Sequence, residues 1–491
     1  MTLLLRHVRL AAEKNGAPAD ILLSGGKISA IGDLPPRADF IFEGEGAFAS
    51  PGFIDVHAAA DHSFALLQHP AQTDTLAQGI TSALIGQKGF SLAPLPERPA
   101  DIFPFPYAQR VNTNWRFLGE MGEHLNRRGL GLNFLSLVGL ENLKSAVRRA
   151  RVKFKTAAAR QVMLAELAHA FRDGAWGISL RADSTADDSL RTADYKALFS
   201  AVAEAAGIIS LSYAADPASW SFILQTATQY PGRVVLTGFA PPDSKSSAEG
   251  LGILEKAFHD FGLRFEVSPA PLRIQNAADF LPAWARQIAE HDRSVLADEW
   301  YLRRIRREMP AFAPGAVHVV AADKGEPLVG YSLAEICKLS GDQDPRDTLF
   351  RLLRETNFRI SFEIRRPQAF IRAALALPGS LLGTGGSAQI ADSIYPVAIA
   401  AANESSFREY LRGACARPVE LAAALQKLTV APADFLGLPH RGRLQPGYAG
   451  DVTVFDPTGN LRLAVVNGRP AWLADGGPVA AAGRFLFKSK K

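Results

Sequence analysis

The chain has 491 residues, of which 47% are hydrophobic and 21% charged, and its formal net charge is +5. This composition is ordinary for a soluble globular protein of this size. The two cysteines, Cys337 and Cys415, cannot form a disulfide framework and have no metal-binding spacing. No apolar run reaches the roughly 18 residues of a membrane span and the N-terminus has no signal-peptide pattern, so we expect a cytoplasmic protein without a membrane partner.

The first fifty residues have the texture of a small all-β unit. Short β-prone runs are separated by turn residues such as Gly25-Gly26 and Pro35-Pro36. This alternation predicts a small sheet or sandwich. The predicted strands cover residues 3–10, 20–23, 27–31 and 40–43.

Residues 51–439 alternate between short apolar runs and longer amphipathic stretches. Repetition of strand and helix with mostly apolar strands predicts a parallel sheet covered by helices, and about eight such units favour an α/β fold of the (β/α)₈ TIM-type barrel. The predicted strands are 53–56, 82–85, 134–138, 177–180, 208–211, 234–236, 265–267, 360–362 and 381–383. The predicted helices include 157–173, 193–206, 246–261 and 368–377, with another beginning near Pro70.

The C-terminal part returns to the texture of the N-terminus. Strands are predicted at 451–455 and 461–466, separated by a Pro-Thr-Gly-Asn turn. We therefore expect residues 1–50 and 440–491 to build one β-sandwich accessory domain from both ends of the chain. The basic clusters 303–307 and 488–491 fit a solvated helix face and a terminus better than a nucleic-acid site, since no aromatic residues interleave them.

Several segments in order resemble the D-aminoacylase (N-acyl-D-amino-acid deacylase) branch of the amidohydrolase superfamily. The resemblance covers nearly the whole chain and implies the barrel and the accessory domain inferred above. In that family, the mouth of the barrel holds zinc. The segments are Pro51-Gly52-Phe53-Ile54-Asp55-Val56-His57, Ala77-Gln78-Gly79-Ile80-Thr81, Gly89-Phe90-Ser91-Leu92-Ala93-Pro94, Gly174-Ala175-Trp176-Gly177-Ile178-Ser179 and the closing run from Gly442 to Asp451.

The resemblance also implies where the metal ligands should lie, and five of the six positions have lost them. His57 matches the first histidine of the family's His-x-His pair. The other positions carry Ala59, Lys88 in place of a cysteine, Tyr213, Gly238 and Gly385, the last in place of the catalytic aspartate. Zinc in an open catalytic site takes about three protein donors, so we expect no cofactor, or zinc only if this alignment is wrong. The arginine expected for a substrate carboxylate falls at Ala215.

Lys88 has two interpretations. In the first, its ammonium group takes the place of a metal cation and acts as a base, as a Schiff-base amine or as a fixed charge that binds an anion. In the second, Lys88 neutralises Asp61 and fills the space that the metal site has vacated. Tyr213 is either a proton donor or a space-filling ring. His62 and His69 precede the first helix as surface histidines, and Asp392 is expected near the barrel mouth without a nameable partner.

Three functions follow. The first is a retired, non-catalytic pseudoenzyme that binds a small anionic ligand, a protein partner or a paralogous active subunit. The second is a metal-independent or re-ligated hydrolase that acts on an amide (C–N, non-peptide) bond through Lys88 and His57. The third, a working zinc deacylase, requires several strand ends to be misaligned. The family's scaffold motifs are kept while its strand-end chemistry is lost, and this pattern favours the first.

Overall fold

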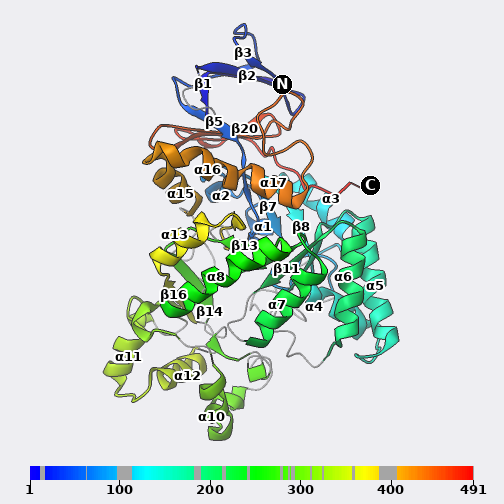
Figure 1. Cartoon of the computed structure of the whole chain (residues 1–491), viewed down its shortest axis with the longest axis vertical. Coiled ribbons are helices and arrows are strands. Elements are labelled where there is room, and N and C mark those ends of the chain that lie inside the picture. Colours follow the sequence, from blue (N-terminus) through cyan, green and yellow to red (C-terminus); the bar gives the residue numbers. More distant parts are fainter. Residues whose placement is uncertain are drawn as a thin grey trace.

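The computed structural model describes most of the chain with internal gaps. These residues are 1–11, 17–61, 64–96, 113–181, 189–212, 217–239, 244–276, 280–282, 284–285, 288, 293–309, 312–322, 326–356, 360–385 and 406–489. Within them, no helix is both long and apolar enough to cross a membrane. The terminal sheet lies at one end of the molecule and helices α10 to α12 lie at the other (Figure 1).

Parallel strands in the middle of the chain close into a barrel. Two sheets of three and six strands supply them, and β8 and β9 act as one interrupted strand. The amide of Val56, just after β6, donates to the carbonyl of Leu382 in β17 at 3.2 Å and closes the ring. The strands are β6 (Phe53–Asp55), β7 (Ile80–Ile85), β8 (Asn133–Ser136), β9 (Val138–Gly139), β10 (Gly177–Arg181), β11 (Ile208–Ser212), β12 (Val234–Thr237), β13 (Arg264–Val267) and β17 (Ser380–Leu382).

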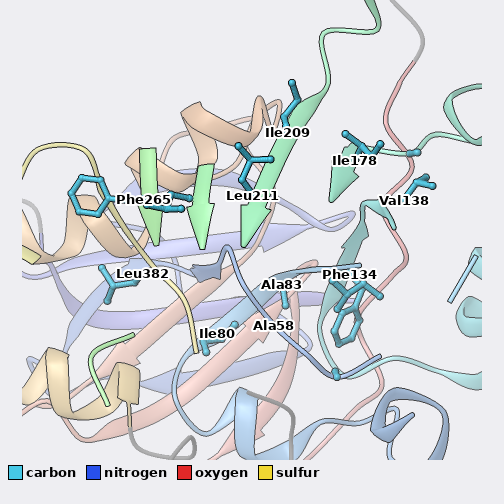
Figure 2. Packing of buried hydrophobic residues seen from close by; sticks show 14 of the residues in the cluster. Ala58, Ile80, Ala83, Phe134, Val138, Ile178, Ile209, Leu211, Phe265 and Leu382 are labelled. Atoms are coloured by element: carbon cyan, nitrogen blue, oxygen red, sulfur yellow. The ribbon is translucent and has the colours of Figure 1, made fainter. Parts of the chain in front are cut away.

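Alternation along these strands sends one set of apolar side chains outward to the helices. Figure 2 shows Ile178, Ile209, Leu211 and Phe265 from this set. They belong to one core cluster with Leu167 and other buried residues of the surrounding helices. The covering helices include α3 (Leu118–Arg128), α4 (Leu140–Arg149), α5 (Ala157–Arg172), α6 (Thr192–Glu204), α7 (Pro217–Gln229), α8 (Ser244–Phe261), α13 (Gln368–Ala376), α15 (Ser406–Cys415) and α16 (Pro418–Leu428).

A separate apolar cluster closes the N-terminal end of the barrel. Ile54, Ile208 and Leu381, which lie at or near the starts of their strands, pack with Phe435 and Leu436 of α17 (Val430–Leu436). Apolar side chains fill this end of the barrel. Chemistry can therefore occur only at the other end, where the C-terminal ends of the strands carry buried polar side chains.

The run 360–362 does not belong to the barrel, so its prediction as a barrel strand was wrong. β16 (Ile360–Arg365) pairs antiparallel with both β14 (Leu272–Asn276) and β15 (Val317–Ala322) in a sheet inserted between β13 and β17. Helices α10 (Glu299–Glu308), α11 (Leu333–Ser340) and α12 (Pro345–Glu355) accompany this sheet and contribute to its own hydrophobic core. A short apolar strand has the same local pattern in either sheet, so sequence alone could not assign it.

Strands from both chain ends join one terminal sheet. They are β1 (Thr2–Leu10), β2 (Ala19–Ser24), β3 (Lys27–Gly32), β4 (Phe40–Glu43), β5 (Phe48–Pro51), β18 (Val452–Phe455), β19 (Leu461–Val466), β20 (Arg469–Leu473) and β21 (Gly477–Pro478). The register of β1 shifts between Leu5 and Val8. Its first half pairs with β2 and β4, whereas Arg9 and Leu10 pair with β5. Apolar residues from the two parts of the sheet that β1 connects then pack in one core, as in a sandwich.

The last described residues leave this sheet and run along the barrel. The Phe134 amide donates to Arg484 at 2.9 Å and the Leu486 amide donates back to Phe134 at 2.7 Å. The Trp176 indole donates to the Leu486 carbonyl at 2.8 Å, and Phe485 is buried. We call residues 483–488 the C-terminal strap.

Candidate functional site

The C-terminal ends of the barrel strands carry a buried pair formed by His57 and Glu266. His57 follows β6 and Glu266 is the third residue of β13, yet Nδ1 of the imidazole lies 3.2 Å from Oε2 of the carboxylate. Both side chains are almost completely buried, at 2% and 4% exposed. Taking two ionisable groups out of water is costly, and this geometry compensates by pairing them.

The backbone around the pair leaves room for it and adds a hydrogen bond. The Gly238 amide, just after β12, donates to the same Glu266 oxygen at 3.0 Å. A Cβ on Gly383 would lie 2.7 Å from the Glu266 Cγ and 2.8 Å from the His57 Cβ. The glycine at position 383 is therefore required by the close approach of these two side chains.

Asp55 anchors the strand end beside this pair. Its carboxylate accepts the backbone amides of His57 at 2.8 Å and Thr384 at 3.1 Å, and the Thr384 hydroxyl at 2.6 Å. Complete burial raises the pKa of Asp55 from 3.8 to about 6, although the hydrogen bonds from Thr384 and His57 act in the opposite direction. Asp55 thus fixes the backbone that carries His57.

The raised pKa of Asp55 predicts a pH-dependent loss of stability. Asp55 binds its proton more tightly in the folded protein than in the unfolded chain. Its contribution to the free energy of unfolding is therefore fully present below about pH 4 and is lost as the pH rises through about 6. This pH dependence should change the free energy of unfolding by about 3 kcal/mol between pH 4 and 7, as measured by urea denaturation. Asp55→Asn should remove it. Asp475→Asn, at an exposed position, should retain it. An unchanged slope in Asp55→Asn would contradict the assignment.

A loop after β7 lies next to this network and carries Lys88. The Gln87 side chain donates to the Val56 carbonyl at 3.0 Å and accepts the Ser210 hydroxyl at 2.7 Å. The Gly89 amide donates to the Ser179 hydroxyl at 3.1 Å. These contacts tie the loop to the middle of β10 and of β11 and to the residue just after β6. They hold Lys88 at a φ of 54°, a left-handed conformation that is costly for a residue other than glycine.

The structure places several of the residues that the resemblance singled out. Ala59 is buried, and Gly238 and Gly385 follow β12 and β17 at the same end of the barrel as His57. Their φ angles are 70° and 65°, and a Cβ on either glycine would meet no described atom within 4 Å. Two positions at which the resemblance implies metal ligands therefore lie near His57 and carry no side chain.

Two further predicted residues, His69 and Asp61, lie in the described part of the chain. His69 is exposed, as expected for a surface histidine. The amide of Gly86 donates to the Asp61 carboxylate at 2.8 Å, which puts Asp61 at the start of the loop that carries Lys88; the pairing of Lys88 with Asp61 stays a prediction. His62, Tyr213, Ala215 and Asp392 lie outside the described residues.

The residues described at this end of the barrel do not fit a zinc site. Among them, no group of three or more histidine, cysteine, aspartate or glutamate side chains could hold a metal ion. Ala59, Gly238 and Gly385 have no donor atoms, and the Glu266 carboxylate is engaged by His57 and Gly238. A zinc ion needs about three protein donors even in an open site.

Glu266 is the residue of the candidate site that the sequence did not reveal. The only signal was a glutamate inside the apolar run Phe265–Val267, because a charged residue on a buried strand needs a partner. That partner, His57, lies 209 residues away. Despite burial, which acts to raise it, the pKa of Glu266 is lowered, since the charge and hydrogen bond of His57, the Gly238 amide and the charge of Arg366 outweigh burial.

The closed parallel barrel and the terminal β domain define the class of fold, a (β/α)₈ barrel with a β domain built from both chain ends. No family model matches the chain. D-aminoacylase of Alcaligenes xylosoxydans xylosoxydans is 25% identical over 507 aligned residues, covering 96% of this chain and 94% of that protein. N-acyl-D-aspartate deacylase of the same organism is 34% identical over 172 residues, which cover 33% of each chain.

Solved structures agree with the fold. A crystal structure of D-aminoacylase has a TM-score of 0.75 at 22% identity, and the two chains cover 99% of each other. N-acyl-D-glutamate deacylase from Bordetella bronchiseptica, solved with zinc and a phosphonate inhibitor, has a TM-score of 0.73 at 20% identity and the same coverage. The homologues and structural neighbours of this chain are therefore D-aminoacylases and N-acyl-D-glutamate deacylases of the amidohydrolase superfamily.

Proposed function

We propose that this D-aminoacylase-like chain is not a zinc-dependent deacylase and acts as a non-catalytic binding or complex-forming protein. The observation that carries this proposal is the His57–Glu266 pair, in which a carboxylate of the barrel engages the one retained ligand of the family's metal site. Three of the other ligand positions, Ala59, Gly238 and Gly385, supply no donor atom. The barrel mouth then binds a small ligand, and a protein partner or a paralogous active subunit supplies any chemistry.

The test of this proposal is metal content together with deacylase activity. We expect the purified chain, after equilibration with zinc and gel filtration, to retain far less than one zinc per molecule. We also expect no release of amine from N-acetyl-D-aspartate or N-acetyl-D-glutamate above the buffer rate. Near-stoichiometric zinc or amine release that chelation abolishes would overturn the proposal. We expect a cytoplasmic location, in keeping with two cysteines that form no disulfide in the structure.

A second candidate is a metal-independent hydrolase acting on a non-peptide amide bond through Lys88 and His57. The strained backbone at Lys88 favours it, because such strain concentrates at functional sites. It predicts that Lys88→Ala abolishes chelator-resistant amide hydrolysis. Arg151→Ala is the matched control, since Arg151 is exposed and has the same φ of 54°. Equal changes in melting temperature with activity lost only in Lys88→Ala would support this candidate; equal activity in both variants would exclude it.

A further inference from the structure

The two ring nitrogens of His57 have opposite surroundings. Nδ1 faces the Glu266 carboxylate, whereas Nε2 is buried and has no hydrogen-bond partner among the described residues. An imidazole with one nitrogen engaged and the other available is the arrangement by which proteins present a histidine to a ligand or a reacting proton.

The chemistry of the pair fixes which nitrogen carries the proton. An ionised carboxylate only accepts hydrogen bonds, and Glu266 Oε2 already accepts the Gly238 amide at 3.0 Å. The hydrogen between Glu266 and His57 must therefore lie on Nδ1. When the imidazole is charged, both of its nitrogens carry a hydrogen; when it is neutral, the hydrogen shared with Glu266 stays on Nδ1 and Nε2 carries a lone pair.

The ring is also held in place by its surroundings. Asp55 accepts the backbone amide of His57, and the His57 carbonyl accepts the Gly385 amide at 2.8 Å. Gly383 packs so closely that a Cβ there would collide with both members of the pair. A carboxylate partner, a fixed backbone and a close neighbour together leave the imidazole one orientation.

We infer that Glu266 is a positioning residue that holds His57 in the Nδ1–H tautomer, so that Nε2 accepts a hydrogen bond from an N–H or O–H group of a ligand in the barrel mouth. This inference rests on the proposed function only in placing a ligand there. The nearby carboxylates Glu266 and Asp55 favour an uncharged or cationic donor such as an amide, an alcohol or an ammonium group.

The tautomer is measurable in the full-length chain by ¹⁵N-histidine labelling and long-range ¹H–¹⁵N correlation. His57 is one of 10 histidines, and His57→Gln assigns its signals. We expect Nδ1 protonated and Nε2 unprotonated in the neutral form of His57, which is reached by raising the pH of the wild-type sample. Glu266→Gln, whose amide oxygen can accept the same two hydrogens, should keep this pattern. Glu266→Ala should lose it and populate the Nε2–H form.

Controls separate positioning from a general effect on the fold. Glu166→Gln changes a mostly buried glutamate of α5 that pairs with Arg149, and it should leave the His57 signals unchanged. If Glu266→Ala does not fold, Glu266→Leu, which fills most of the same volume, takes its place. An Nε2–H tautomer in the wild type, or an unchanged tautomer after Glu266 is replaced by Ala or Leu, would overturn the inference.

A matched pair of probes tests the ligand class. Acetamide has an N–H donor, and acetate, of nearly the same shape, has none. We expect acetamide to shift the His57 Nε2 resonance and acetate to leave it unchanged. A shift with acetate alone, or with neither probe, would overturn the ligand class. Zinc binding or deacylase activity would instead overturn the proposed function. A failure of this inference can therefore be distinguished from a failure of the proposed function.

Discussion

Deleting residues 483–491 should leave the protein largely unfolded at 37 °C. The deletion removes the C-terminal strap, including Phe485, which is 3% exposed and belongs to the main core. Burying one such aromatic side chain contributes about 2–3 kcal/mol, and each lost hydrogen bond about 1 kcal/mol more. The expected total of about 5 kcal/mol or more is comparable with the whole stability of a typical domain.

The strap matters because it connects elements that are otherwise distant in the chain. It pairs with β8 through Phe134, its Leu486 carbonyl accepts the Trp176 indole, and the Lys488 ammonium caps the carbonyls of Ala205 and Ala206 after α6. A Cβ on Gly122 of α3 would collide with Phe485 and Phe487, so the helix packs directly against the strap.

The measurement is thermal unfolding by circular dichroism together with the soluble yield at 25 and 37 °C. Deleting only residues 489–491 is the control, since it keeps Phe485, Leu486 and Lys488. That control should melt within a few degrees of the full chain, because removing the last few residues of a chain usually costs little. A wild-type melting temperature after deletion of residues 483–491 would show that the strap is dispensable.

Gly177→Ala is the second substitution with a large expected effect. Gly177 begins β10 and pairs with Ile208 of β11, and a Cβ there would lie 2.0 Å from the Ile208 carbonyl oxygen. That oxygen is part of the barrel backbone and cannot rotate away. The strands must separate locally, which should cost about 2–4 kcal/mol as overpacking and broken pairing.

Urea denaturation reports this loss as a lower transition midpoint. Gly252→Ala is the matched control, because Gly252 lies in α8 and a Cβ there would meet no described atom within 4 Å. It should stabilise the protein by about 0.5–1 kcal/mol, since alanine is the better helix former. Equal midpoints for Gly177→Ala and the wild type would mean that the strands accommodate a side chain at this position.

The sequence predicted where helices and strands lie better than it predicted which strands pair with one another. Helices α5, α6, α8 and α13 and strands β1 to β4, β18 and β19 lie within two residues of the predicted ranges, because hydrophobic period and turn residues are local signals. Strands β5, β20 and β21 were not predicted. The run 360–362 was assigned to the wrong sheet, since its pattern is equally apolar in the barrel and in the inserted sheet. Local patterns specify an element and leave its neighbours open.

The same division applies to the site. From sequence, the strand that ends at His57 and the loss of donor atoms at Ala59, Gly238 and Gly385 could be stated directly, since residue types need no coordinates. The pairing of His57 with Glu266, and the requirement for glycine at position 383 between them, could not be stated. Those contacts join three strands from distant parts of the chain, and only barrel closure brings them together.

The sequence by itself therefore determined the class of fold, and it predicted that the metal-ligand positions implied by the resemblance lack side-chain donors at Ala59, Gly238 and Gly385. The tertiary structure decided which side chain His57 pairs with. It brings β13 beside the end of β6, buries a carboxylate against the imidazole and removes water from both. In that environment an ionisable group must find a partner, and the partner available is set by strand order in the closed barrel.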